Sequence, residues 1–122
     1  MKVQELMEIS DAFKELENKE LSFDAALVVA ENLEAIRVPM SVANKQRDGL
    51  VEKYAERDKD GNWVRVGANS FKIADPEAYS KDLEALFEND VEIVEIKTIP
   101  KAALEGISIK PVKLRPILKY IV

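Results

Sequence analysis

The stretch "FDAALVVAENLEAIRVPMSVANKQRDGLVEKYAER", residues 23 to 57, decides the fold. Within it, side chains recur at alternating spacings of four and three residues, and all but one of them are apolar or aromatic. Such a heptad-type stripe is typical of a helix that packs along another helix. The positions of the stripe are Val29, Leu33, Ile36, Met40, Ala43, Arg47, Leu50 and Tyr54.

Pro39 lies inside this stretch. A proline in a helix interior removes one backbone hydrogen bond and clashes with the preceding turn, at a cost of about 3 kcal/mol. The segment could therefore divide into two helices that meet at Val38. The stripe keeps its phase across the proline, however, and this favours one kinked helix from Phe23 to Arg57.

A helix of this length outreaches its predicted neighbour. At 1.5 Å per residue, some 35 residues would span about 50 Å. Residues 3–17 also have the apolar pattern of an amphipathic helix, but they are too few to cover the whole stripe. Two arrangements would cover the remainder: the C-terminal half of the chain folds back over it, or another copy of the chain does.

Turn and capping residues divide the next part of the chain. Two runs rich in β-branched and aromatic residues, Trp63–Val66 and Phe71–Ile73, predict a β-hairpin. Asp75 is a good N-cap, and the following segment predicts a helix over Pro76–Glu88. The apolar run after it predicts a strand over Val91–Lys97.

The C-terminal segment is expected to be helical in short pieces. A helical turn should end at Gly106, and Pro111 should open a last helix whose apolar residues are Leu114, Leu118 and Ile121. The fold class is therefore α+β and mostly helical. One long helix, kinked at Pro39, packs with shorter helices and a small antiparallel sheet, in a single domain spanning residues 1–122.

Composition argues against several kinds of chemistry. The chain has no cysteine and no histidine. It therefore lacks thiolate chemistry, the commonest general base and the commonest metal ligand. Its four glycines are scattered and form no phosphate-binding loop. The sequence predicts no catalytic, cofactor-binding or metal-binding residue, and we expect a protein that is not an enzyme.

Charge is distributed unevenly along the chain. Residues 1–96 hold 22 acidic and 12 basic side chains, whereas residues 97–122 hold one acidic and six basic side chains. The basic tail would either pack on the acidic helices of its own chain or contact another subunit or a polyanion. With little arginine and one aromatic residue in the tail, the composition argues against nucleic acid as the partner.

The segment "RDKDGNWVRVG", residues 57 to 67, invites comparison with a calcium loop. With Gly61 at the sixth position, oxygen ligands would occupy the first, third and fifth positions, but the twelfth would be Gly67, which has no side chain. An EF-hand requires a bidentate glutamate at the twelfth position. We therefore expect a polar turn in which Gly61 adopts a positive φ.

Arg47 is the charged exception in the stripe. A charge at such a position either sets register by pairing with an acid of a partner or extends to the surface along its aliphatic stem. We expect a protein partner, which includes a second copy of the chain. The candidate partner-binding residues are Val29, Leu33, Ile36, Met40 and Arg47 in the stripe, with Lys110, Lys113, Arg115 and Lys119 in the tail.

Three stretches occur in order along the chain: "LVEKYAERDKDGNW", "IADPEAYSKDLEALFENDVEIVEIKTI" and "LEGISIKPVKLRPILKYIV". Together they resemble a family of small bacteriophage proteins of unknown function. The family pattern runs from a helix and a long helix through a turn, a strand, a helix and a "VEI" strand to a closing helix, and Pro39 departs from it. The matching residues are Lys53, Tyr54, Asp58, Lys59, Asp60, Gly61, Pro111 and Leu114.

The resemblance implies a phage or prophage origin and transfers no catalytic residue. We therefore expect a phage-encoded structural, assembly or adaptor protein that acts through protein–protein interaction. The alternative is an inhibitor of a host enzyme or defence complex, which would use the acidic N-terminal surface. The start of the chain lacks the pattern of a signal peptide, and its apolar runs are far shorter than the ~20 residues of a membrane span. The host cytoplasm or the virion is the expected location.

Overall fold

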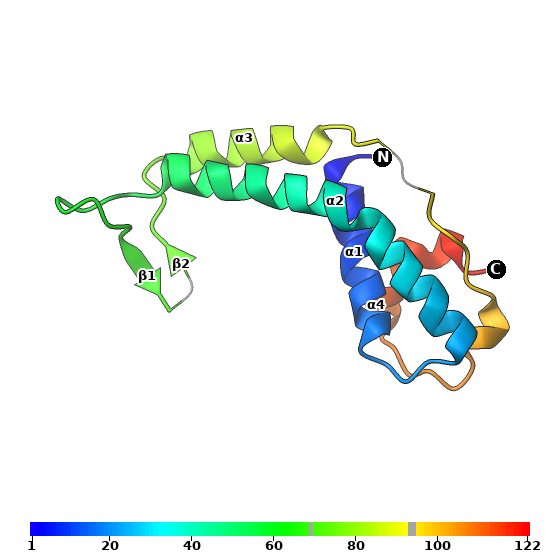
Figure 1. The fold of residues 1–122 in the computed structure, drawn as a ribbon. Helices are drawn as coiled ribbons and strands as arrows, with labels where there is room; N and C mark the ends of the chain where they lie inside the picture. Colours follow the sequence, from blue (N-terminus) through cyan, green and yellow to red (C-terminus); the bar gives the residue numbers. More distant parts are fainter. Residues whose placement is uncertain (69, 93–94) are drawn as a thin grey trace.

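The computed structural model describes residues 1–68, 70–92 and 95–122. The fold is α+β and mostly helical, with a two-stranded antiparallel sheet (Figure 1). The predicted fold class and the predicted bounds of the first helix and of the helix after the hairpin are confirmed. The elements are α1 (Val3–Glu17), α2 (Phe23–Tyr54), β1 (Arg65–Gly67), β2 (Ser70–Phe71), α3 (Pro76–Glu88), the 3-10 helix η1 (Lys101–Leu104), α4 (Pro111–Leu114) and the 3-10 helix η2 (Arg115–Tyr120).

Helix α2 runs through Pro39 without a break, so the prediction of one kinked helix is confirmed. Its first turn is capped by Ser22, whose hydroxyl oxygen accepts a hydrogen bond from the N–H of Ala25 at 3.3 Å. Figure 1 shows that α2 changes direction near its middle, between a half that lies beside α1 and a half that lies beside α3. The bend lets one helix pack against two partners.

The predicted end of α2 at Arg57 is wrong, because the helix ends at Tyr54. Ala55 adopts an extended backbone and forms an antiparallel bridge with Ile73, while Arg57 forms one with Trp63. The last three residues of the predicted helix therefore belong to the base of the hairpin. Backbone pairing with distant residues has replaced helix propagation at this point.

The hairpin is confirmed, but its strands are shifted from the predicted bounds. Three backbone segments form a ring of hydrogen bonds at its base: Glu56 N–H donates to Lys72, Lys72 N–H donates to Val64, and Val64 N–H donates to Glu56, each at 2.8 Å. The hydrogen bond from Lys72 to Val64 flanks the first pair of the ladder between β1 and β2, which is Arg65 with Phe71. The rings of Trp63 and Phe71 pack edge-on, with centroids 4.6 Å apart.

Two hydrophobic clusters lie along α2. The first joins α1, the N-terminal half of α2 and the C-terminal segment, and the second joins the start of α1 to the other half of α2 and to α3. The helix that precedes α2 and the segments that follow it thus both pack against α2. The buried residues of the first cluster are Ile9, Ala12, Phe13, Leu16, Ala25, Val29, Ile99 and Ile117, and those of the second are Val3, Ala43 and Leu86.

The predicted strand over Val91–Lys97 is not a strand in its described residues, and Ile93 and Val94 lie outside them. Lys97 instead directs both its backbone N–H and its backbone C=O to the side chain of Asn32 in α2. The amide side chain of Asn32 thus supplies the donor and the acceptor that a neighbouring strand would supply in a sheet. The described end of the predicted strand, Lys97, is therefore held against helix α2.

The last segment begins at Pro111 as predicted, but it changes into the 3-10 helix η2 after one turn. The nitrogen of Pro116 has no hydrogen to donate to the preceding turn. Side chains of a 3-10 helix repeat every three residues, so Ile117 points into the core. Ile117 is buried, whereas Leu118, a predicted apolar-face residue, keeps 56% of its surface exposed.

Candidate protein-binding surface

The stripe predicted to bind a partner is largely covered by the chain itself. Val29 and Ile36 are each only 2% exposed, so they have no free surface to offer a partner. Ala43 is buried against Val3 and Leu86. Of the two arrangements that the sequence left open, the structure therefore has the first, in which the later part of the chain folds back over α2.

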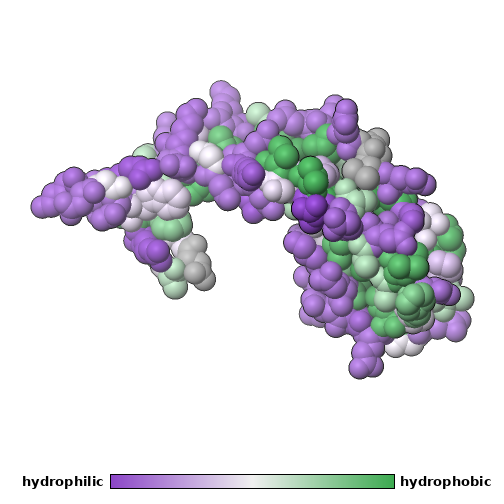
Figure 2. Space-filling view, in the orientation of Figure 1, coloured by the Kyte–Doolittle hydropathy of each residue, from purple (hydrophilic) through white to green (hydrophobic). Residues whose placement is uncertain are grey.

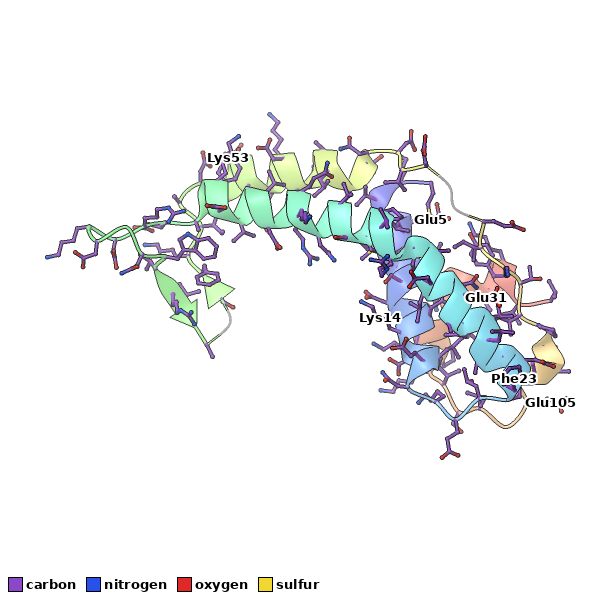
Figure 3. All side chains as sticks on the ribbon, viewed as in Figure 1. Glu5, Lys14, Phe23, Glu31, Lys53 and Glu105 are labelled. Atoms are coloured by element: carbon purple, nitrogen blue, oxygen red, sulfur yellow. The ribbon has the colours of Figure 1, made fainter. Side chains whose placement is uncertain are left out.

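Leu33 and Met40, the other two apolar candidates, are half-buried at a groove between α1 and α2. The groove has a volume of about 430 Å³. Its rim carries charges of both signs, including Glu17 from α1 and Arg37 from α2. Lys14 of α1, which Figure 3 labels, lies on the same rim. These mixed charges select no particular ligand.

Arg47, the charged position of the stripe, lies at the surface of α2. Its Nη2 donates a hydrogen bond of 3.2 Å to Oδ1 of Asn44, one turn earlier on the same helix. Its exposed position fits the interpretation in which the side chain extends to the surface. The interpretation in which Arg47 pairs with an acid of a partner stays a prediction.

Part of the apolar surface that remains exposed lies on the other side of α2. Phe23, Leu27 and Val38 keep 79%, 46% and 59% of their surface exposed, and Ala30 between them is exposed as well. We call these four residues the outer face of α2. Figure 2 shows apolar surface over the middle of α2 and over the lobe that contains its N-terminal half, and Figure 3 places Phe23 in the first turn.

The sequence contains a signal for this outer face that the prediction missed. Phe23, Leu27 and Ala30 are spaced by four and three residues, as in the stripe that was recognised. Helix α2 therefore carries two apolar stripes in its N-terminal half. A helix that is apolar on two sides is usually covered on two sides.

The basic tail is partly neutralised within the chain. Lys119 Nζ lies 2.6 Å from Glu5 Oε1 of α1, and Lys97 pairs with Glu31 of α2. Each of these hydrogen-bonded ion pairs raises the pKa of its lysine. The interpretation in which the tail packs on its own acidic helices thus holds for these two residues. The other three candidates, Lys110, Lys113 and Arg115, are exposed.

The polar loop after α2 is a turn, as predicted. Asp58 Oδ1 accepts hydrogen bonds from the N–H of Asp60 at 2.9 Å and from the N–H of Asn62 at 3.0 Å. Gly61 has a φ of +83°, which only glycine adopts easily. The carboxylate of Asp58 is thus directed at its own backbone. Within residues 1–68, 70–92 and 95–122, no group of three acidic side chains is arranged to hold a metal ion.

A small polar network joins the end of α2 to α3. The hydroxyl of Tyr54 donates a hydrogen bond of 2.5 Å to Oδ2 of Asp82, and Lys53 Nζ lies 3.6 Å from the same oxygen. The hydrogen bond lowers the pKa of Asp82 and raises the pKa of Tyr54. Tyr79 packs edge-on against Tyr54, with centroids 6.1 Å apart. The network fastens the two helices together.

Comparison of the chain with protein-family models, with curated proteins and with solved structures finds no match. None of the helices in the described ranges is both long enough and apolar enough to cross a membrane.

Proposed function

We propose that this chain works by binding protein, as a phage-encoded structural, assembly or adaptor protein, without a chemical step of its own. The observation that carries the proposal is the outer face of α2. Phe23, Leu27 and Val38 are exposed to solvent there, whereas the other apolar stripe of the helix is largely buried within the chain. Burying one such side chain contributes about 1.5–3 kcal/mol, which favours a partner that covers this face.

The phage origin in this proposal rests on the sequence resemblance alone. The protein-binding part rests on the exposed apolar side chains of α2, which share one side of that helix. Rigid elements bind partners at a lower entropic cost than loops do, because they need not be ordered on binding.

The alternative proposal is an inhibitor of a host enzyme or defence complex that engages a basic site through acidic side chains. Part of the acidic surface is already matched within the chain, since Glu5 pairs with Lys119 and Glu31 pairs with Lys97. The outer face of α2 has no such internal match among the described residues. We therefore favour the first proposal.

The experiment places a photo-crosslinking amino acid at Leu27, on the outer face, in cells infected by the phage that encodes the chain. The matched control carries the same amino acid at Val112 on α4, which is 60% exposed. We expect one defined covalent product from position 27 and only background from position 112. Equal labelling from both positions would contradict the proposal.

The location of the chain separates the two roles. Mass spectrometry should detect an assembly protein in purified particles or their precursors. An inhibitor should be found only in the extract of infected cells, in a complex with a host protein. If the chain is absent from mature particles and from all their precursors, the inhibitor role is favoured.

A further inference from the structure

The chain contains two Asp–Gly dipeptides, and they lie in different kinds of backbone. Asp48 and Gly49 lie inside α2, whereas Asp60 and Gly61 lie in the polar turn that follows this helix. Both aspartates are exposed to solvent, and a Cβ added at either glycine would meet nothing within 4 Å. The two dipeptides therefore have equally open surroundings and differ in the conformation of their backbone.

An aspartate that precedes a glycine can rearrange without an enzyme. The backbone nitrogen of the glycine attacks Cγ of the protonated carboxyl group, whose hydroxyl leaves with the amide hydrogen as one water molecule, and a succinimide ring remains. Glycine favours this step because it has no Cβ to obstruct the approach. Water then opens the ring. Attack at Cγ restores aspartate, whereas attack at the backbone carbonyl breaks the original peptide bond and leaves isoaspartate, in which the chain continues through Cγ.

Helix α2 protects the first dipeptide from this reaction. Helical dihedral angles direct the N–H of Gly49 along the helix axis, toward the carbonyl group four residues earlier. The helix continues for more than one turn beyond Gly49, to Tyr54. The nitrogen can therefore reach the carboxyl group of Asp48 only when several neighbouring hydrogen bonds of the helix open together.

The turn protects the second dipeptide much less. The N–H of Gly61 donates a hydrogen bond of 3.0 Å to the carbonyl oxygen of Asp58, within the same turn. Residues 58–62 belong to no helix or strand, so the turn opens without unwinding a longer element. Exposed loop tips open at a lower free energy than helix interiors do.

We propose that the bond between Asp60 and Gly61 is a site of spontaneous modification, where the folded chain converts Asp60 to isoaspartate with water as the only reactant and so loosens the hairpin. The product keeps its mass and its negative charge, but its main chain is one carbon atom longer. The turn depends on close spacing at this point. Asp58 Oδ1 accepts from the N–H groups of Asp60 and Asn62, and Arg57 Nη1 donates to the carbonyl oxygen of Gly61 at 3.0 Å.

Trp63 reports on the loosening, because it is the only tryptophan of the chain. It forms an antiparallel bridge with Arg57 across the turn, and the guanidinium carbon of Arg57 lies 5.7 Å from the centre of its ring. A longer turn shifts Arg57 and Trp63 out of register, which exposes the ring to water. Helix α2 ends before the turn, so its helical content should not change.

The test incubates the folded chain for several weeks at neutral pH, beside a sample unfolded in guanidinium chloride. Cleavage after glutamate places the two dipeptides on separate fragments, residues 35–52 and 57–77, and electron-transfer fragmentation assigns isoaspartate to an individual residue. In the folded chain we expect isoaspartate to form at least about tenfold faster at Asp60 than at Asp48, because the helix must open before Asp48 can react. In the unfolded chain the two rates should be similar.

The purified isoaspartyl form should emit Trp63 fluorescence at a longer wavelength, with unchanged helical circular dichroism. Asp60→Glu is the control, because residue 60 contributes its backbone N–H to the turn and the longer side chain closes its ring far more slowly. Its fluorescence should stay constant through the incubation.

Three results would overturn the inference. The first is equal rates at Asp48 and Asp60 in the folded chain. The second is a folded chain without isoaspartate at Asp60 after the unfolded chain has formed it. The third is a fluorescence of Trp63 that is the same in the isoaspartyl and the unmodified forms, or that drifts equally in Asp60→Glu.

Discussion

The side chain of Asn32 and the backbone of Lys97 form a two-point contact that fastens the C-terminal part of the chain to α2. Asn32 Oδ1 accepts a hydrogen bond of 2.8 Å from the N–H of Lys97, and Nδ2 donates one of 2.9 Å to its C=O. Asn32 is fully buried. Two residues further on, Ile99 enters the first hydrophobic cluster and bridges to Ile121.

Replacing Asn32 with leucine should lower the free energy of unfolding by about 2–4 kcal/mol, because two backbone groups of Lys97 lose their partner in a partly buried place. Urea denaturation followed by circular dichroism measures the loss. The control is Asn44→Leu, since Asn44 is half-buried and its side chain accepts a hydrogen bond from the exposed Arg47. Equal losses in the two variants would show that the contact contributes nothing specific.

The helices were predictable because their signals are local. Ser22 and Asp75 each cap the first turn of a helix with a side-chain oxygen, and Asp75 is the cap that the sequence analysis predicted. Apolar periodicity then predicted the ends of α1 and α3, but not the end of α2. The continuous phase of the stripe also predicted correctly that α2 passes through Pro39.

The features that escaped prediction depend on residues far apart in the chain. Asn32 and Lys97 are separated by 65 positions, and no local pattern joins an amide to a distant backbone. The two apolar stripes of α2 have similar spacing, so the sequence could not rank Val29 above Leu27. The placement of α1 and of the C-terminal segment decides which stripe is buried.

Ile117→Ala should lower the free energy of unfolding by about 2–5 kcal/mol, because it leaves a cavity in the first cluster. Ile117 is 0% exposed, while its neighbour Leu118 is 56% exposed. Leu118→Ala should therefore change stability by less than about 1 kcal/mol. Thermal denaturation of the pair tests the 3-10 register of η2. The reverse order of losses would mean that the segment is an ordinary α-helix with Leu118 inward.

Two glycines with equally open surroundings should respond to alanine in opposite directions. A Cβ added at Gly49 or at Gly61 would meet nothing within 4 Å. Gly49 lies inside α2, so Gly49→Ala should raise the free energy of unfolding by about 0.5–1 kcal/mol. Gly61 has a φ of +83°, so Gly61→Ala should lower it by about 1–2 kcal/mol. A stabilising Gly61→Ala, measured by urea denaturation, would contradict the turn geometry.

The contact between Tyr54 and Asp82 should make the stability of the protein depend on pH in the acid range. The pKa of Asp82 is lowered mainly by the hydrogen bond from the Tyr54 hydroxyl. A carboxyl whose folded pKa lies below its unfolded value, near 4, stabilises the fold above that value and loses this contribution as the pH falls through the folded pKa. Tyr54→Phe should therefore lower stability at pH 7 more than at pH 2, as urea denaturation across this range would measure. Tyr79→Phe is the matched control, because the Tyr79 hydroxyl forms no hydrogen bond within the described part of the chain. If both variants reduce the pH dependence of the free energy of unfolding between pH 2 and pH 7 by the same amount, this dependence does not arise from the contact between Tyr54 and Asp82.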